Sequence, residues 1–564
     1  MKKLALILAI TLLMIPVAAQ GVTYIQAPPL KNVIKASPGP VKSGGPVQVP
    51  LITWGGDIAT ILANGNAAVT TKGSIFGQKG LNLKLVRVDD FKKQVESYLK
   101  GDTPFLRGTM GMINMAAEVL DANPGTKPVV IYQLTWSNGG DCLVVKPGIN
   151  SVGDLRNKTI AVQAYGPHVA YLAKVLGDAG LTMNDVKIKW VPDLTGTDNS
   201  PMEAFYDSGV DAVFVIIPDG LTLTSGGAEG TGAEGSVKGA KILMSTKTAN
   251  RIIADVYAVR SDYYQANQEQ VREFVHGLLL AEQEMRAVFA DKQGHMNEYK
   301  PMITAAAQIL LDSPQATADA EALYADCQYV GFRGNVNFFG NEKWPRSFER
   351  ITDEIQTAFV TAGLIKAKVP LEKAKWDYDQ LRAGLTGIDD VESPRFKAAE
   401  VAKVITQRQA QGNLGEGQLF SFEINFQPNQ KDFSEDLYHD AFQKVVELAS
   451  AYGGAVITVE GHSDPNRYNK LVKEGADEVV LRRTMQAAKN LSMSRAISVR
   501  DSVIAFAEKN GLPLDKSQFT VIGHGISQPK FPNPATKQEW LDNMRVVFRI
   551  IQIEAEDSAF EPVK

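Results

Sequence analysis

The feature that most constrains the fold is an alternation of short apolar strands with amphipathic helices between residues 51 and 348. Its clearest strand is Asp211–Ile217, in which every residue after the aspartate is apolar. Two more strands, Thr159–Gln163 and Val186–Val191, flank a helix at His168–Ala179. Strands that are apolar on both faces lie inside parallel sheets that helices cover on both sides. This part of the chain therefore predicts an α/β architecture.

The composition is ordinary for a globular protein, and a length of 564 residues favours two or three domains. The formal net charge of −4 argues against a nucleic-acid partner. Only two cysteines occur, Cys142 and Cys327, which is too few for a disulfide framework or a cysteine zinc site. In an oxidising compartment they either pair with each other or stay as two buried thiols.

Residues 1–20 have the pattern of a secretory signal: Lys2 and Lys3, an apolar run, then the small residues Val17–Ala19. The run is too short to be a comfortable membrane span, and no cysteine for a lipid anchor follows it. We therefore expect an exported protein. Residues 21–49 are rich in proline, glycine and lysine, which predicts an extended linker with little to bury.

Three segments of the α/β region carry a resemblance by their order. They are Ser151–Val162, Met202–Ala212, and Ile252–Val259 followed by Val271–Val275. They resemble the entry to the second lobe, its Asp-Ala strand, and the return to the first lobe in periplasmic substrate-binding proteins of ABC transporters. The closest type is the one for nitrate, taurine and thiamine precursors. The resemblance implies a two-lobed, type II binding-protein fold that closes around one small molecule.

In such a fold the ligand lies at the carboxyl ends of strands and at helix N-termini. Aromatic residues there would stack on a flat or methylated ligand, and free N–H groups would hold an anion. The acidic residues favour an amine or a polyhydroxyl compound instead. The competing interpretation places both tryptophans in the core and makes Asp57 a helix N-cap. The predicted solute-binding residues are Trp54, Gly56, Asp57, Thr109, Trp136, Tyr165, Gly166, His168 and Asp219.

Four motifs near the C-terminus follow one another in a fixed order. They are Ala455–Pro465 with its Gly-His-Ser-Asp turn, Leu491–Ala496, Val521–Gly525, and Asn543–Ile550. Together with the alternating strand Phe420–Phe426, they resemble the OmpA C-terminal-like domain, a smaller α+β domain that binds peptidoglycan.

Asp464 and Arg495 are the predicted peptidoglycan-binding residues. Asp464 follows a strand end in a Gly/Pro turn, which exposes its carboxylate. Ser492 is predicted to cap a helix whose first turn contains Arg495, so that free N–H groups and a guanidinium would attract a carboxylate. The resemblance implies that the two side chains clamp the amine and carboxylate of diaminopimelate in the stem peptide. The alternative is a turn cap and a surface ion pair.

The chain departs from the OmpA-like pattern in two places. Pro465 stands where the family usually has a polar residue, and the connection at residues 466–490 is longer than usual. That connection contains Lys470, Lys473, Arg482 and Arg483. These basic residues either add contacts to the wall or displace the pocket.

The predicted organisation has six parts. They are a signal peptide (1–20), a linker (21–49), the binding-protein domain (50–365), a helical connector (366–415), the OmpA-like domain (416–555) and a tail (556–564). Within the binding-protein domain, the first lobe takes about 50–145 and 245–365 and the second about 146–244.

The sequence thus predicts a periplasmic solute-binding protein held noncovalently at peptidoglycan. We expect no enzyme, cofactor or metal, because no nucleophile elbow, phosphate-binding loop or zinc helix occurs. A structural module whose binding-protein fold docks a protein partner is the alternative. Whether an inner-membrane permease or another envelope complex receives the solute stays open.

Overall fold

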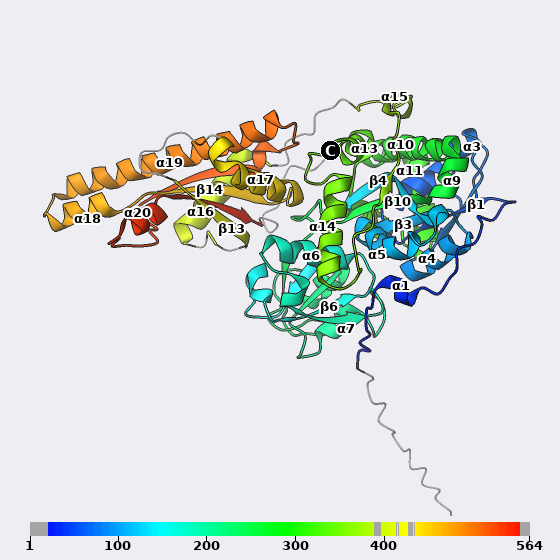
Figure 1. Cartoon of the computed structure of the whole chain (residues 1–564), viewed down its shortest axis with the longest axis horizontal. Coiled ribbons are helices and arrows are strands. Elements are labelled where there is room, and N and C mark those ends of the chain that lie inside the picture. Colours follow the sequence, from blue (N-terminus) through cyan, green and yellow to red (C-terminus); the bar gives the residue numbers. More distant parts are fainter. Residues whose placement is uncertain are drawn as a thin grey trace, which may run out of the picture.

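The structure is a computed structural model that describes residues 21–388, 396–412, 414–415, 417–426, 433 and 435–552. The predicted signal peptide and the tail from 556 lie outside the described residues. Two α/β lobes lie side by side, and a further α/β domain extends from them (Figure 1). No described helix is both long enough and apolar enough to cross a membrane.

The first lobe is built on a mixed sheet in the order β11-β4-β10-β3, with β12 parallel to β4, and on the parallel pair β1-β2. Its strands are β1 (Val47–Leu51), β2 (Leu83–Arg87), β3 (Phe105–Thr109), β4 (Pro128–Ser137), β10 (Ala254–Arg260), β11 (Cys327–Tyr329) and β12 (Glu372–Lys373). Its helices are α2 (Asp57–Ala63), α3 (Ile75–Gln78), α4 (Phe91–Lys100), α5 (Met110–Leu120), α9 (Ser261–Ala266), α10 (Gln268–Ala290), α11 (Met296–Leu311), α12 (Thr317–Ala325), α13 (Gly331–Gly340) and α15 (Tyr378–Leu381).

The second lobe has a five-stranded sheet in the order β7-β6-β8-β5-β9. Strands β6, β7 and β8 are parallel, while β5 runs antiparallel to β8. Strands β6 and β8 are largely buried, as their apolar sequences predicted, whereas the edge strand β7 is mostly half-buried. The strands are β5 (Asp141–Val145), β6 (Thr159–Gln163), β7 (Lys187–Val191), β8 (Ala212–Ile216) and β9 (Lys241–Ser245), and the helices are α6 (His168–Asp178), α7 (Pro201–Phe205) and α8 (Ile217–Leu223).

The chain crosses between the lobes twice, from β4 into β5 and from β9 back into β10. The second lobe is therefore an insertion in the first, as the resemblance implied. Helix α14 (Phe348–Thr361) lies against both lobes. Gln356 on α14 donates to Asn114 of α5 at 2.8 Å, and Glu354 pairs with Lys174 of α6 at 3.1 Å.

The C-terminal domain has a four-stranded sheet in the order β13-β16-β14-β15. Strands β14 and β15 are parallel, and β16 is antiparallel to both of its neighbours. The elements are α16 (Ala398–Gln411), β13 (Gln418–Asn425), α17 (Glu435–Ala451), β14 (Val456–His462), α18 (Asn466–Lys473), α19 (Glu478–Lys509), β15 (Phe519–Gly525), α20 (Lys537–Asn543) and β16 (Arg545–Ile551).

Two glycines let helix α19 pack closely on this sheet. A Cβ atom at Gly461 would lie 2.0 Å from the carbonyl oxygen of Ser492, and one at Gly523 would lie 2.8 Å from Met493. Any larger residue at Gly461 would therefore push the helix away from the strands. The C-terminal domain also contacts the second lobe, because Tyr452 donates to Asp178 at 2.7 Å and Gly454 N–H donates to the carbonyl of Thr248.

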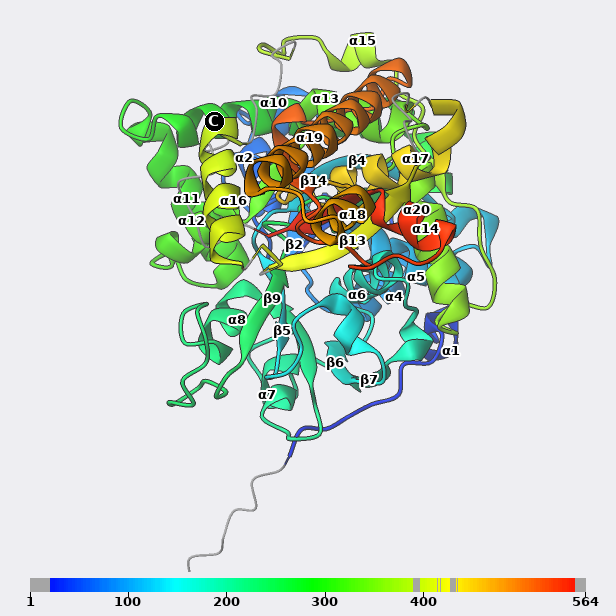
Figure 2. The same ribbon diagram turned by 90° about the vertical axis from the view of Figure 1, so that its left-hand side faces the viewer.

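The predicted linker at 21–49 is extended and buries few residues, as expected, but it is not free of the lobes. This segment is packed along both lobes, as the dark-blue ribbon in Figure 2 shows. Ile25 pairs with Trp190 of the second lobe, and Leu30 is buried beside α5 of the first, where Lys31 binds Glu118 at 2.7 Å. Sparse apolar residues with long-range partners hold it there.

Helix α13 covers the aromatic segment 331–340, and its Phe338 and Phe339 are buried. The helical connector predicted at 366–415 is partly helical, as α15 and α16, but β12 adds to the first lobe, and α16 packs against Val456 and Ile522 of the C-terminal sheet through Val404. Cys142 and Cys327 are both buried and are not joined by a disulfide.

Candidate functional site

The loop after β14 fixes the carboxylate of Asp464. Its Oδ1 accepts from the backbone N–H of Asn466 at 2.9 Å, and its Oδ2 accepts from the side-chain amide of Asn543 at 3.1 Å. The first bond closes a turn within the loop, as the Gly/Pro sequence predicted. The second ties the loop to the end of α20, just before β16. Asp464 remains partly exposed and has no cationic partner within the described part of the chain.

Arg495 lies at the same end of the sheet. Its guanidinium carbon is 4.5 Å from the centre of the Phe426 ring, and the residue is only 6% exposed. Phe426 in turn donates its backbone N–H to Met544, the neighbour of Asn543. The Nε atom of Arg495 is buried without a partner among the described residues, and burial lowers the pKa of this guanidinium. An anion bound here would supply the missing acceptor.

The predicted helix start at Ser492 is wrong. Helix α19 begins at Glu478, where Asp477 caps it, so Ser492 and Arg495 lie in its interior. The hydroxyl of Ser492 instead accepts from the backbone N–H of Gly525 at 2.8 Å and joins α19 to β15. The long connection 466–490 forms α18 and the first turns of α19. Any ligand carboxylate must therefore rely on the guanidinium, without free helical N–H groups.

Glu460, His462 and His524 form a buried cluster near this loop, with ligand atoms within 4.8 Å of one another. Glu460 already accepts from Thr458 (2.6 Å), His524 (3.0 Å) and Arg549 (2.8 and 3.1 Å). Although burial would raise the pKa of Glu460, the bonds from His524 and Arg549 bring it down to about 2. Its lone pairs are filled and its charge is balanced by Arg549. Glu460, His524 and Arg549 thus form a structural network, whereas both ring nitrogens of His462 are buried without a partner among the described residues.

In the first lobe, Asp57 belongs to a buried ion network. Arg107 on β3 donates to Asp57 at 3.0 Å and to Asp255 on β10 at 2.9 Å, and none of the three side chains is more than 3% exposed. Tyr257 also donates to Asp57 at 3.1 Å. Burial raises the pKa of Asp255 to about 6 despite Arg107. These groups pair with one another inside the lobe, but the Nη2 atom of Arg107 is buried without a partner among the described residues.

Trp54 and Gly56 lie next to this network and contact it through Thr135. The indole N–H of Trp54 donates to the hydroxyl of Thr135 at 3.0 Å, and that hydroxyl donates to Asp255. A Cβ atom at Gly140, at the lobe crossing, would lie 2.6 Å from the Trp54 ring. Trp54 therefore covers the crossing and is partly exposed, whereas Gly56 is buried against Thr135.

Two other predicted residues are structural. Trp136 is 2% exposed and packs edge-on against Phe338 and Trp344, so it is a core residue, as the competing interpretation held. Thr109 caps α5 by accepting from the N–H of Met112 at 3.2 Å. The predicted pocket thus loses Trp136 as an aromatic platform.

The remaining predicted residues belong to the second lobe. Tyr165, with φ of +62°, donates its hydroxyl to the carbonyl of Pro28 at 2.8 Å. Next to it, Gly166 lies against Gln163. His168 is buried and bound to Asp141 at 2.7 Å, and a carboxylate oxygen of Asp219 is buried without a partner in the described structure.

Sequence reasoning missed Asp326, which lies near the lobe crossing. A Cβ atom at Gly140 would lie 3.2 Å from it. Burial, and then the charge of Asp141, raise the pKa of Asp326 to about 7. In the sequence, Asp326 is marked only by its neighbour Cys327, and this does not indicate that it lies near the lobe crossing. Asp141, Asp326 and Trp54 therefore gather around Gly140 from three separate segments.

The lobes are in close contact beside this group. A Cβ atom at Gly111 on α5 would lie 2.6 Å from the Cβ of Ala170 on α6. Helices α5 and α6 of the two lobes are thus in direct contact.

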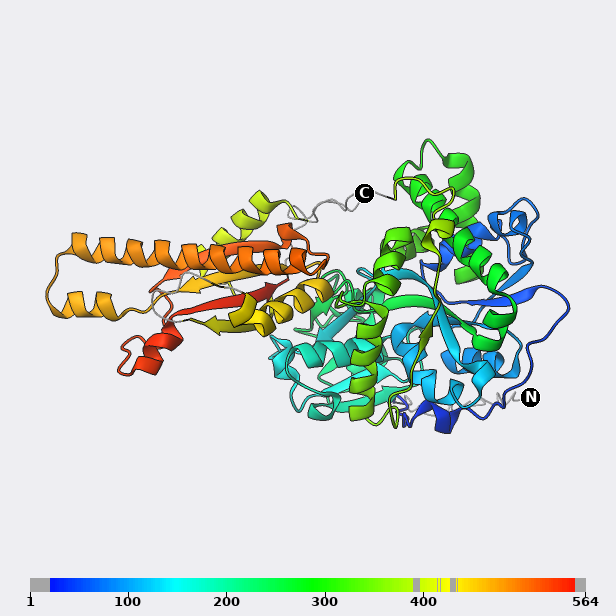
Figure 3. The same cartoon turned by 45° about the horizontal axis from the view of Figure 1, so that its top comes forward.

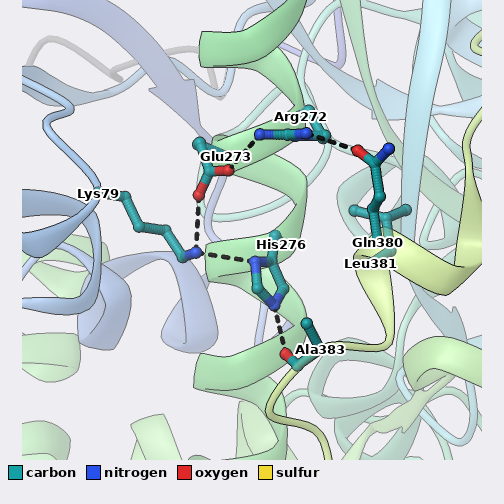
Figure 4. Close-up of a pocket in the computed structure, with 7 residues that line it drawn as sticks. All are labelled: Lys79, Arg272, Glu273, His276, Gln380, Leu381 and Ala383. Carbon is teal, nitrogen blue, oxygen red and sulfur yellow. Dashed lines mark hydrogen bonds and ion pairs between the residues drawn. The ribbon is translucent and has the colours of Figure 1, made fainter.

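A separate hollow of about 320 Å³ lies on the first lobe beside α10 and α15 (Figure 4). His276 accepts from the Lys79 ammonium at 2.8 Å and donates to the carbonyl of Ala383 at 2.7 Å. Glu273 binds Lys79 and Arg272. Its polar side chains thus satisfy one another and hold the segment after α15 against α10.

Comparison with known proteins gives one family match. The family described as NMT1/THI5 like matches residues 69–288. Among curated proteins, no relative matches the chain significantly.

Several solved structures are similar at low identity. The alkanesulfonate-binding protein SsuA from Xanthomonas axonopodis pv. citri is 16% identical, with a TM-score of 0.38, over 59% of this chain and 100% of that one. The aliphatic sulphonate binding protein SsuA from Escherichia coli is 15% identical, with a TM-score of 0.39, over 62% and 99%. The desulfurization enzyme DSZB is 15% identical, with a TM-score of 0.32, over 60% and 96%. What identifies part of the chain is thus the family match: residues 69–288, which span the second lobe and about half of the first, are similar to the NMT1/THI5-like family.

Proposed function

We propose that this protein captures a small molecule between its two lobes in the periplasm and is tethered to peptidoglycan by its C-terminal domain. The observation that carries the first half is the double crossing between lobes within a segment of the NMT1/THI5-like family. Two crossings form a hinge, and closure around a ligand follows from such a hinge. Binding, and no catalysis, is the proposed activity.

The groups around the lobe crossing favour a cationic amine or a polyhydroxyl compound as the solute. Asp326 and Asp219 have no cationic partner in the described part of the chain. Burial is the main cause of the raised pKa of both carboxyls. Burial makes ionisation of these carboxyls unfavourable. A ligand ammonium group would offset this by pairing with a carboxylate, and the indole of Trp54 would cover the ammonium group.

Thermal unfolding with a library of small amines, sugars and sulfonates tests the solute proposal. We expect an amine or a polyol to raise the Tm, because a ligand at about 100 times its Kd stabilises the native state by about 2.7 kcal/mol. Asp326→Asn should remove most of the shift with an amine, while Asp353→Asn, on the exposed side of α14, should keep it. A shift with sulfonates alone would contradict the amine assignment.

Wall attachment rests on the end of the C-terminal sheet where Asp464 and Arg495 lie. One carboxylate and one guanidinium without an ionic partner suit a zwitterion such as diaminopimelate. A four-stranded sheet with helices fits the smaller α+β domain that the resemblance implies. Asn543 and Phe426, which hold the two charged groups, would belong to the same site.

Co-sedimentation of the mature protein with purified peptidoglycan tests the tether. We expect the wild type to pellet and Asp464→Ala and Arg495→Met each to bind at least tenfold more weakly, because each removes a charge-assisted bond. Arg482→Ala, on the exposed connection, is the matched control and should pellet like the wild type. If all variants pellet alike, the basic side chains of 466–490 are the wall contact instead.

A docking module for a protein partner is the second candidate. It is favoured by the number of predicted solute contacts that the fold itself uses, such as Trp136, Asp57 and Thr109. The same thermal screen separates the two, because a module that has lost its solute would show no ligand-dependent Tm.

A further inference from the structure

Residues 466–491, named here the hairpin segment, project beyond the C-terminal sheet. They comprise α18, the turn after it and the first half of α19. Figures 1 and 3 show these two helices (orange) at the end of the molecule farthest from the lobes. None of these residues is buried, although Ser492 and Arg495, further along α19, are. The hairpin segment therefore contributes no core of its own.

The hairpin segment nevertheless exposes large apolar side chains. Helix α18 is amphipathic, with Tyr468, Leu471 and Val472 on one side. Two helices that bury so little gain no packing energy from standing out in solvent. The exposed side chains are Val472 (49%), Val479 (49%), Val480 (38%), Met485 (45%) and Leu491 (45%).

The charge of the hairpin segment is positive, with six basic and three acidic residues and a net charge of +3. The acidic residues are already used, because Glu474 pairs with Lys470, Glu478 pairs with Arg482, and Asp477 caps α19. The basic residues that have no carboxylate within salt-bridge distance in the described structure are Arg467, Lys473, Arg483 and Lys489.

We propose that the hairpin segment docks on an anionic lipid surface. Such a surface takes up exposed apolar side chains and at the same time attracts the unpaired lysines and arginines. Peptidoglycan is anionic but has no apolar phase that could bury the three valine side chains and the methionine side chain. A second copy of this chain would bring another net charge of +3 against the first. Lipid is the partner that matches both properties.

Flotation of the full chain with vesicles tests this proposal. We expect binding to vesicles of phosphatidylcholine and phosphatidylglycerol in equal parts, little binding to phosphatidylcholine alone, and release at high salt because the attraction is screened. Lys473→Glu with Arg483→Glu should weaken binding at least about 25-fold, since each basic residue at an anionic surface accounts for about a fivefold change. Val472→Ser with Val479→Ser should weaken it without changing the salt dependence.

The matched control changes the same residue types on the first lobe. Val69 is 46% exposed and Lys72 is also exposed, so Val69→Ser with Lys72→Glu should bind vesicles like the wild type. Asp464→Ala should keep vesicle binding, which separates this proposal from the wall tether. Equal binding to both vesicle types, no binding, or a dimer in light scattering that the hairpin variants abolish would each overturn it.

Discussion

Replacing Arg107 by methionine should cost about 3–5 kcal/mol of unfolding free energy, the largest effect that we expect from a single substitution. The change leaves Asp57 and Asp255 buried together with no cation between them. Arg107 has a raised pKa because the two carboxylates outweigh its burial, so it is charged at every relevant pH. Arg107→Lys keeps one charge but loses the fork that reaches both carboxylates, and should lose part of this stability.

Denaturant unfolding followed by circular dichroism measures the effect. The matched control is Arg156→Met, because Arg156 also pairs with an aspartate but is 54% exposed at its side chain. We expect this control to change stability by less than about 1 kcal/mol. Adding Asp57→Asn and Asp255→Asn to Arg107→Met should recover stability, because the unpaired charges disappear. A loss below about 1 kcal/mol in Arg107→Met would refute the account.

The sheet architecture was predictable because periodicity is a local property. The apolar run after Asp211 became β8, Ala212–Ile216, and the run at 159–163 became β6, since only a buried strand suits such sequences. The insertion of one lobe into the other followed from the order of the segments.

The candidate site was harder to predict because its partners are distant in sequence. Trp136 is a core residue through Phe338 and Trp344, and Asp57 is satisfied by Arg107 and Asp255. None of these pairings leaves a local pattern. The helix start predicted at Ser492 is wrong for another reason. The inserted residues before it are themselves helical, so a residue type that favours a cap lies inside α19. Asp464 and Arg495 stay a prediction, although the structure brings both to one end of the sheet.

The second large effect that we expect is a fall in stability between about pH 4.5 and 7 caused by Glu282 on α10. Its carboxyl accepts from Tyr132 at 2.9 Å, its other oxygen is buried without a partner among the described residues, and Arg286 is 3.9 Å away. Burial, only partly opposed by Arg286, raises the pKa of Glu282 from 4.5 to about 7. The folded state therefore holds a proton that the unfolded state releases in this range.

The free energy of unfolding falls with rising pH because the native state binds more protons than the unfolded state in this range. Below about pH 4.5 both states are protonated and nothing is lost, whereas above about pH 7 the native state carries a buried charge. The difference in pKa corresponds to roughly 3 kcal/mol.

Glu282→Gln keeps a partner for Tyr132 and cannot ionise, so its unfolding free energy should exceed that of the wild type by up to this amount at pH 8 and match it near pH 4. Glu269→Gln, at an 85% exposed side chain on the same helix, is the control and should keep the wild-type pH dependence. If the profiles of wild type and Glu282→Gln run parallel from pH 4 to 8, Glu282 is not the group that titrates.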